Sequence, residues 1–368
     1  MGYKKIIIKN GLVFNGENFI RKDIYIADGK ISKIENKINL KAHVVYNAKG
    51  LIVAPGLIDI HTHIYGISDD CFGTPAPSSF FPFGVTTAVD AGSVKGNKFL
   101  LENMKLGAYT FPSVQIKNDC VEFYKIEKLL HTFGDRVVGI KTYIDSSNGD
   151  VLSSQPLKKV IAFAGGKGLK VMVHCSNSPI KMEEIIDLLR PGDILTHPYH
   201  GGDNNALLND FSALKKAKEK GVIIDTGMAG HIHTNFEIMK KCISAGLYPN
   251  TISSDLTNLS VFQRGGNYGL TLCMGVMRAM GMPETEIFKA VTTNAAAAIG
   301  KESNLGYIKI GSRADLAVLD YGFHPFNFNI DPGNKIKGNY SYNCKLTLCD
   351  GQIVYKEKNL DHRIKILI

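Results

Sequence analysis

Short apolar segments alternate with helical patterns through residues 56–306, and this alternation limits the possible folds more than any other feature of the chain. Several of the helical patterns end in Gly, as helix C-termini commonly do. The strand candidates are GLIDIHTH, GVTTAVDAG, FPSVQI, VVGIKTYI, LKVMVHCS, DILTHPY, VIIDTGM and NTISSDL. Repeated βα units predict a parallel sheet, and eight over about 250 residues predict an α/β fold of the (β/α)8 TIM-barrel type. An open doubly wound sheet is the alternative, but no Gly-rich phosphate-binding segment follows the first strand.

Both ends of the chain have the pattern of β-structure instead. Short β-branched segments lie there, and the pairs Asp28–Gly29 and Asp350–Gly351 predict two-residue hairpin turns. We therefore predict a small β-sandwich domain built from residues 1–55 plus 307–368. A barrel domain of residues 56–306 would be inserted between its two halves.

The net charge of the chain and the distribution of its basic residues indicate which kinds of substrate and binding partner to expect. The chain has 43 Lys and Arg against 34 Asp and Glu, a net charge of +9, but basic residues are scattered and often stand beside acids, as in LKKAKEKG. We expect a small-molecule substrate and no nucleic-acid partner, and the positive charge would help to attract an anionic substrate.

Hydropathy and cysteine content bear on the location of the protein. No apolar run reaches about 18 residues and the N-terminus is too polar for a signal peptide, so we expect no membrane association. Seven cysteines without a CxxC pair indicate no disulfide framework. We expect a cytoplasmic homo-oligomer.

Residues able to bind a metal stand at the predicted strand ends, where TIM barrels place their active sites. His61 and His63 point the same way, because residues i and i+2 of a strand share a face. The full set is His61, His63, Lys141, His174, His197 and Asp255. Each alone has an ordinary interpretation as a loop, capping or surface residue, but convergence on one barrel mouth favours a site. Imidazole and carboxylate suit Zn²⁺, and a buried lysine that loses its proton can react with CO₂ to form a carbamate able to bridge two ions.

In this order, GLIDIHTH, the lysine of the fourth strand, MVHC, LTHPYHG and ISSDL resemble the amidohydrolase superfamily. TTNAAAAIG and GYIKIGSRADLAVLD are similar to its segments after the catalytic Asp, so that the resemblance covers essentially the whole chain. It implies two divalent metal ions, expected to be Zn²⁺, bridged by N6-carboxylysine at Lys141. By position, His61, His63 and Asp255 would hold the more buried ion, and His174 and His197 the other.

Within that superfamily, DIHTHIYG, GVTTAVDAGS, GIKTYID and LRPGDILTHPYHG most resemble the cyclic-imidase/dihydroorotase-like amidohydrolase/deacetylase subgroup. This resemblance implies deacetylation of an N-acetyl-amino acid or an acetylated hydroxy acid. Dihydroorotases also resemble the chain, but they usually carry Arg two residues after the second His, where Tyr65 stands here. Cys175 follows His174 directly and would face the other way, so we do not expect it to be a ligand.

The expected reaction is attack of a metal-bridging hydroxide on an amide or ester carbonyl, with Asp255 as the catalytic residue that passes the proton to the leaving group. His231 and His233 follow the seventh strand, and His231 is the candidate for oxyanion stabilisation, with a backbone contact as an equal interpretation. The candidate substrate contacts are Tyr65, Asn177, His200, His231 and Arg264. Arg264 would pair with a carboxylate, or it lies on the surface.

Three alternatives share the scaffold. A cyclic amide hydrolase of the dihydroorotase or hydantoinase type is the first. A purine-type deaminase is the second, and Lys141 argues against it, because many such deaminases use one metal and do not need that lysine. A catalytically silent binding protein is the third, and the complete ligand set argues against it, because a silent copy would be expected to have lost a ligand.

Overall fold

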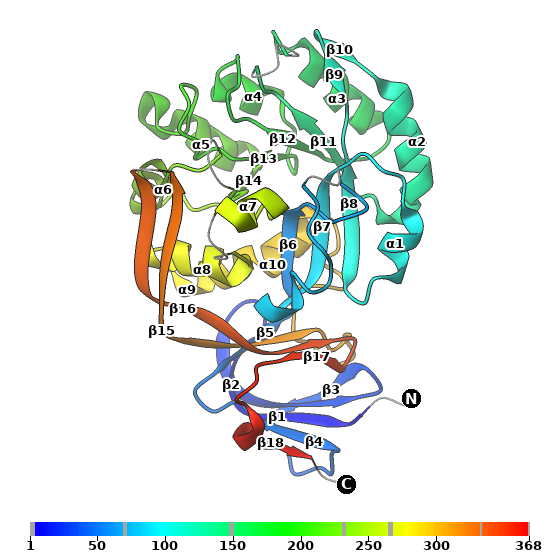
Figure 1. Ribbon diagram of the computed structural model, residues 1–368, viewed down its shortest axis with the longest axis vertical. Coiled ribbons are helices and arrows are strands. Elements are labelled where there is room, and N and C mark those ends of the chain that lie inside the picture. The colour runs from blue at the N-terminus through cyan, green and yellow to red at the C-terminus, as the bar shows by residue number, and fades with distance from the viewer. Residues whose placement is uncertain are drawn as a thin grey trace.

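The computed structural model describes residues 4–68, 72–146, 151–229, 233–263, 268–331 and 333–366. An α/β body lies above a sheet built from both ends of the chain, and both termini lie at the sheet end of the molecule (Figure 1). The predicted α/β class is therefore confirmed.

Parallel strands form the centre of the body in two sheets. One contains β6 (Leu57–Thr62), β7 (Val85–Ser93) and β8 (Gly107–Pro112); the other contains β11 (Ile140–Tyr143), β12 (Val171–His174), β13 (Ile194–Thr196) and β14 (Ile223–Asp225). Every neighbouring pair in each sheet is parallel. Side chains such as Ile58, Ile60, Phe111 and Met172 pack together in a buried cluster between them.

Single parallel bridges continue the pairing between the two sheets. They are Thr110 with Val137, Ser113 with Lys141, Asp225 with Thr251 and Thr62 with Leu256. Segment 251–256 thus lies between β14 and β6, in place of the predicted eighth strand, NTISSDL. Backbone hydrogen bonds pair this segment with both neighbours, as from the Thr251 N–H to the Ile224 carbonyl at 3.1 Å and from the His63 N–H to the Leu256 carbonyl at 3.0 Å. Side chains supplement them: Ser253 N–H donates to Thr226 Oγ1 at 2.9 Å and Ser254 N–H donates to Asp59 Oδ1 at 3.1 Å. The third predicted strand is displaced: FPSVQI begins within β8, which ends at Pro112.

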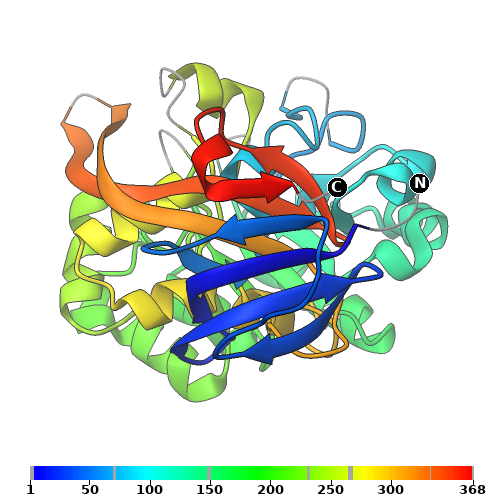
Figure 2. The same cartoon turned by 90° about the horizontal axis from the view of Figure 1, so that it is seen from below.

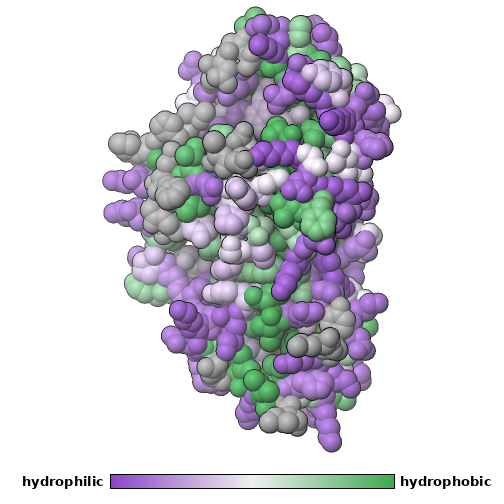
Figure 3. Space-filling model, turned by 45° about the vertical axis from the view of Figure 1, so that its right-hand side comes forward, coloured by the Kyte–Doolittle hydropathy of each residue, from purple (hydrophilic) through white to green (hydrophobic). Residues whose placement is uncertain are grey.

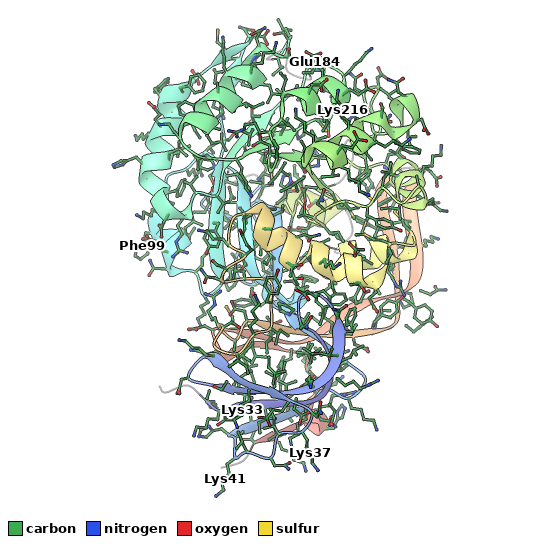
Figure 4. The ribbon with its side chains drawn as sticks, turned by 180° about the vertical axis from the view of Figure 1, so that it is seen from behind. Lys33, Lys37, Lys41, Phe99, Glu184 and Lys216 are labelled. Carbon is green, nitrogen blue, oxygen red and sulfur yellow. The ribbon has the colours of Figure 1, made fainter. Side chains whose placement is uncertain are left out.

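Helices surround these strands on the outside (Figure 1). They are α1 (Lys98–Asn103), α2 (Phe123–Phe133), α3 (Gln155–Gly166), α4 (Met182–Leu188), α5 (Leu208–Lys220), α6 (Phe236–Ser244), α7 (Asn258–Gln263), α8 (Leu270–Ala279), α9 (Glu284–Ala290) and α10 (Thr293–Ala298). Short elements complete the body: β9 (Ile116–Lys117), β10 (Cys120–Val121), η1 (Phe81–Phe83) and η2 (Gly134–Arg136). In Figure 4 the labelled Glu184 and Lys216 lie on the outer helices α4 and α5.

The terminal segments form one connected nine-stranded sheet, seen from below in Figure 2. Its strands are β1 (Ile6–Phe14), β2 (Phe19–Ala27), β3 (Lys30–Glu35), β4 (Val44–Asn47), β5 (Ile52–Pro55), β15 (Leu316–Asp331), β16 (Asn334–Cys349), β17 (Gln352–Lys356) and β18 (Ile364–Ile366), with η3 (Asp361–Arg363) before the last. Antiparallel pairing of β5 with β15 joins the two ends of the chain. Both predicted hairpin turns are confirmed, at Asp28–Gly29 between β2 and β3 and at Asp350–Gly351 between β16 and β17.

A long hairpin made by β15 and β16 leaves this sheet and runs up the side of the body to α6 (Figures 1 and 2). Its two strands have 16 residues each. Phe328 is fully buried and its ring lies 5.4 Å from that of Phe236 at the start of α6. The sequence patterns RADLAVLD and LTLCDGQIVYKE predict only the portions nearest the terminal sheet, so the length of this hairpin is a finding of the structure.

The molecular surface carries mixed side chains. On the face in Figure 3, hydrophilic residues are spread over both ends, with smaller hydrophobic areas among them. Lys33, Lys37 and Lys41 gather on the terminal sheet, at the end of the molecule away from α4 and α5 (Figure 4). Among the described residues, no helix combines the length and the apolar character needed to cross a bilayer.

Candidate metal centre

The six predicted ligands lie around one cavity. His61 lies on β6, and His63 is the first residue after that strand. Lys141 lies on β11, His174 is the last residue of β12, and His197 is the first residue after β13. Asp255 belongs to the bridging segment 251–256. The structure therefore brings together all six side chains from strand ends that are far apart in the sequence.

Asp255 is the common neighbour of three imidazoles. Its Oδ1 lies 3.3 Å from His61 Nε2 and 3.2 Å from His63 Nε2, and its Oδ2 lies 3.8 Å from His197 Nε2. Lys141 Nζ lies 3.1 Å from His61 Nε2. The ring centroids of His174 and His197 are 4.8 Å apart. The site is thus one compact cluster of nitrogen and oxygen donors.

Two of these residues hold left-handed backbone conformations. The φ angle is 66° at His197 and 46° at Asp255. Such angles are unfavourable for residues other than glycine and are concentrated at functional sites. The Asp255 N–H donates to the His61 carbonyl at 2.8 Å, which holds the turn in place. Both chain segments turn sharply where their side chains enter the cavity.

A hydroxyl group and a buried carboxylate fix the orientation of His61. Thr196 Oγ1 donates to Asp225 Oδ2 at 2.8 Å and lies 3.0 Å from His61 Nδ1. Because the Thr196 proton is used on Asp225, the hydroxyl oxygen accepts from His61 Nδ1–H. The Nε2 lone pair of His61 is then directed at the cavity, which is the orientation that a metal ligand requires.

The same arrangement supports His63. Ser68 Oγ donates to Asp90 Oδ2 at 2.7 Å and lies 3.0 Å from His63 Nδ1. Asp90 Oδ2 also accepts from the Ile64 N–H at 2.7 Å, so this oxygen serves as an acceptor. His63 therefore keeps its proton on Nδ1 and presents Nε2 to the cavity. Sequence reasoning singles out neither Ser68 nor Asp90, because no local pattern links them to His63.

His197 is oriented by the backbone. Its Nδ1 lies 2.8 Å from the Gly227 carbonyl oxygen, which can only accept, so Nδ1 carries the proton. Gly227 has φ 46°, and a Cβ atom there would lie 2.5 Å from the His197 ring. Only a residue without a side chain fits beside this imidazole.

Burial and neighbouring groups shift the pKa values of the residues in the cluster. Desolvation lowers the pKa of His61 and of His174, and lowers that of His197 well below its usual value. Desolvation also lowers the pKa of Lys141 to about 8. Burial by itself would raise the pKa of Asp255, but His61, His63 and His197 hold it well below the usual value. The centre consequently combines neutral imidazoles with an ionised carboxylate.

This donor set fits divalent cations. Asp255 Oδ1 is buried and makes no hydrogen bond to a described residue, although two imidazoles lie close to it, and His174 Nε2 lies 3.4 Å from Asp145 Oδ2. Buried polar atoms are rarely left without a partner, so an ion is a natural complement for the carboxylate oxygen. Two groups have their ligand atoms within 4.8 Å of one another: His61, His197 and Asp255, and His174, His197 and His233. Neutral imidazole and carboxylate are ligands that Zn²⁺ prefers.

The cavity above the cluster has a volume of about 480 Å³. Its other lining residues are Phe72, Tyr143, Ala229, His233, Thr257, Leu259 and Ser260. Most of its wall beyond the ligands is thus apolar or aromatic, with hydroxyl groups in addition. This composition suits a small organic substrate.

Three of the five predicted substrate contacts lie among the described residues. Tyr65 is 54% exposed, Asn177 is partly buried with φ 53°, and His200 is fully buried. None of these three is among the cavity-lining residues. His231 and Arg264 lie outside the described residues. All five roles remain predictions.

His233 is the residue at the site that sequence reasoning passed over in favour of His231. Its ring stacks on His197 at 4.5 Å and meets His174 edge to face at 4.8 Å. The sequence feature that could have indicated His233 is HIH at residues 231–233, after the seventh predicted strand. Its two histidines have the same spacing as His61 and His63.

Comparisons with known proteins agree with this geometry. A model of the amidohydrolase family matches residues 52–354. A deacetylase of Brucella anthropi is 28% identical over 322 residues, covering 80% of this chain and 77% of that protein. A solved dihydroorotase superposes with a TM-score of 0.84 at 22% identity, covering 96% of this chain and 99% of that one. A solved adenine deaminase has the same TM-score at 24% identity and the same coverage, so that the fold is common to enzymes of both names.

Proposed function

Because the chain belongs to the amidohydrolase family and is a hydrolase of carbon–nitrogen bonds other than peptide bonds, we propose that it is a metal-dependent deacetylase. The proposed substrates are N-acetyl-amino acids, with acetylated hydroxy acids as the ester counterparts. The observation that carries the proposal is the convergence of Asp255, the oriented imidazoles and Lys141 on one cavity.

In this proposal His61, His63 and Asp255 hold one divalent ion, His174 and His197 hold a second, and N6-carboxylysine at Lys141 bridges them. Zn²⁺ is the expected metal, and such ions polarise a carbonyl and lower the pKa of water. Two observations support the role of Lys141: it is fully buried, and its lowered pKa favours the free amine that reacts with CO₂.

Asp255 is the residue that moves the proton. Its carboxylate is ionised and lines the cavity, and its Oδ1 makes no hydrogen bond to a described residue, although the Nε2 atoms of His61 and His63 lie within 3.3 Å of it. It accepts a proton from the attacking water and delivers it to the leaving nitrogen or oxygen. The left-handed turn and the bond from its N–H to the His61 carbonyl keep the carboxylate in place during both transfers.

The cavity wall binds and orients the substrate. Phe72 and Leu259 provide apolar surface for a side chain or acyl group. Burial raises the pKa of Tyr143, so its phenol keeps its proton and can donate a hydrogen bond to the carbonyl oxygen. Tyr65, Asn177, His200, His231 and Arg264 stay candidates for contacts to the rest of the substrate.

Several finer features belong to the same proposal. The parallel bridges support a closed (β/α)8 barrel over residues 56–306, and the terminal sheet supports a separate domain of residues 1–55 plus 307–368. A β-sandwich arrangement of that domain, a cytoplasmic location, a homo-oligomeric state and the lack of nucleic-acid or membrane partners are part of the proposal as well.

Cyclic amide hydrolysis and purine-type deamination are the competing activities. The deacetylase of Brucella anthropi supports deacetylation, whereas the dihydroorotase and adenine deaminase structures, at 22% and 24% identity, describe the fold. Tyr65 in place of the dihydroorotase Arg also favours deacetylation.

A substrate screen tests the proposal. Purified enzyme supplied with Zn²⁺ and bicarbonate is assayed on N-acetyl-D- and N-acetyl-L-amino acids, acetylated hydroxy acids, dihydroorotate, hydantoins and adenine, with Asp255→Asn as the inactive control. We expect acetate release from one acetylated class and much weaker turnover of the cyclic and purine compounds. Turnover of dihydroorotate or adenine above every acetylated compound would contradict the proposal.

A further inference from the structure

We propose that His233 is a ligand of the outer metal ion, which is then held by the three imidazoles of His174, His197 and His233. This inference rests on the binuclear centre proposed above and extends its ligand set by one residue. It assigns to His233 a role in metal binding in addition to any contact with substrate.

The geometry of the three rings carries the inference. Each ring offers a nitrogen, and the three nitrogens lie within 4.8 Å of one another. His233 stacks on His197 at an interplanar angle of 25° and meets His174 at 83°. All three line the same cavity. Three histidines with a free fourth position form a known type of catalytic zinc site.

The orientation of His233 is set from outside the cavity. Its Nδ1 lies 2.9 Å from the hydroxyl of Ser176, which is fully buried beyond the end of β12. The proposal places the proton on Nδ1, donated to this hydroxyl, which leaves Nε2 as the nitrogen available to an ion. His63 and its Ser68 hydroxyl have the same arrangement, at 3.0 Å. A hydroxyl behind the ring is thus a repeated feature of the imidazoles at this centre.

The long hairpin holds the segment that carries His233. Asn334, the first residue of β16, accepts from the Phe236 N–H at 3.0 Å and donates to the Thr234 carbonyl at 2.7 Å. The backbone N–H of Asn235 donates to the Tyr199 carbonyl at 2.8 Å. The segment that follows His233 is therefore fixed on both sides, and Asn334 is a positioning residue for this imidazole.

The two groups of donors overlap at His197. His197 belongs to both groups of donors, the one with His61 and Asp255 and the one with His174 and His233. An imidazole Nε2 is a ligand for one ion at a time. Without His233, the outer ion would depend on His174, on His197 and on the modification of Lys141.

Metal titration of the apoprotein tests the assignment without relying on turnover. The chelator-treated full chain is titrated with Co²⁺ in the presence of bicarbonate, and bound metal and the visible absorption of Co²⁺ are measured for wild type, His233→Ala and His233→Gln. His131→Ala, a change on the exposed surface of α2, is the control. We expect both His233 variants to bind the first ion like wild type and the second at least about tenfold more weakly, with a changed second-ion spectrum.

The outcomes separate the two proposals. If wild type binds two ions and both His233 variants bind the second with unchanged affinity and spectrum, the assignment of His233 is overturned and the binuclear centre stands. If wild type itself never binds a second ion, the binuclear centre fails and this assignment fails with it.

Asn334→Ala provides a second test, with Asn339→Ala on the exposed face of the same strand as its control. We expect Asn334→Ala to lower the affinity for the second ion by up to about tenfold and to leave the affinity for the first ion unchanged. The reason is that the His233 ring is retained but the segment that carries it is less firmly held. Equal weakening of both ions would indicate a general structural effect and would contradict the positioning role.

Discussion

Asp255 and His61 are joined twice: the Asp255 N–H donates to the His61 carbonyl at 2.8 Å, and Asp255 Oδ1 lies 3.3 Å from His61 Nε2. The first contact links the backbone of β6 to that of segment 251–256. The second lies inside the site. The contact between β6 and segment 251–256 and the geometry of the proposed metal centre therefore depend on the same two residues.

Asp255→Asn separates metal binding from proton transfer. The amide keeps the backbone contact to His61 and the shape of the side chain, but it cannot accept the proton. We expect kcat to fall by about 10²- to 10⁴-fold while much of the bound metal remains. Steady-state assays paired with metal analysis measure both effects. A near-normal kcat in this variant would show that another group moves the proton.

Lys141→Ala removes the residue proposed to carry the bridging carboxylate. We expect loss of metal and of activity, and partial rescue by short carboxylic acids, because they can occupy the space of the side chain and supply the missing oxygens. The parallel control is Lys215→Ala, which truncates a lysine on the outer helix α5. The control should keep its metal and activity; full metal content in Lys141→Ala, or a loss that carboxylic acids do not relieve, would argue against a bridging role for Lys141.

Thr196→Val removes the hydroxyl that links His61 to Asp225 and keeps the shape of the side chain. His61 Nδ1 then loses its acceptor, and the buried Asp225 loses one donor. We expect metal affinity to fall by about 10- to 100-fold. The control is Thr132→Val on α2, which removes a hydroxyl bonded to the Lys128 carbonyl. Chelator competition measures the affinity, and equal affinities for the two variants would refute the orienting role of Thr196.

Gly227→Ala tests the space beside His197. The new Cβ would lie 2.5 Å from the His197 ring, at a residue with φ 46°. Gly246→Ala is a matched control, because Gly246 has φ 74° with no atom within 4 Å of a Cβ. We expect both variants to lose about 1–3 kcal/mol of stability from backbone strain. Only Gly227→Ala should also lose metal and activity. Denaturant unfolding and metal analysis together distinguish strain from displacement of the ligand.

The buried Lys141 predicts a pH dependence of stability in the metal-free protein. Its pKa is about 8 in the folded state against the usual 10.5. Folding must therefore disfavour the ammonium form, so its cost is full below pH 8 and disappears as the pH rises to 10.5. We expect Lys141→Met to be more stable than wild type at pH 7. The difference in melting temperature should shrink between pH 8 and 10.5, and a constant difference across that range would contradict this prediction.

The sequence predicts much of the α/β body, because the signals for its strands and helices are local. Apolar strands that end in His61, His63, His174 and His197 can be recognised one at a time. Helices with apolar spacing separate them, and Asp–Gly pairs predict the hairpin turns that the structure confirms. The NTISSDL segment shows the limit of this logic, since its backbone pairing is irregular and is supplemented by hydroxyl and carboxylate contacts that its β-character does not predict.

By itself, the sequence determined the α/β class, the order of the candidate ligands and the family resemblance, because these depend on local periodicity and on spacing along the chain. Only the tertiary structure decided which nitrogen His61, His63 and His197 present and that His233 stacks on His197. It also decided that Asn334 reaches the segment after His233. Ser68, Asp90, Thr196, Asp225 and Asn334 act through hydrogen bonds to residues of other elements. Such partners are chosen by packing in space, and no local propensity of the chain encodes them.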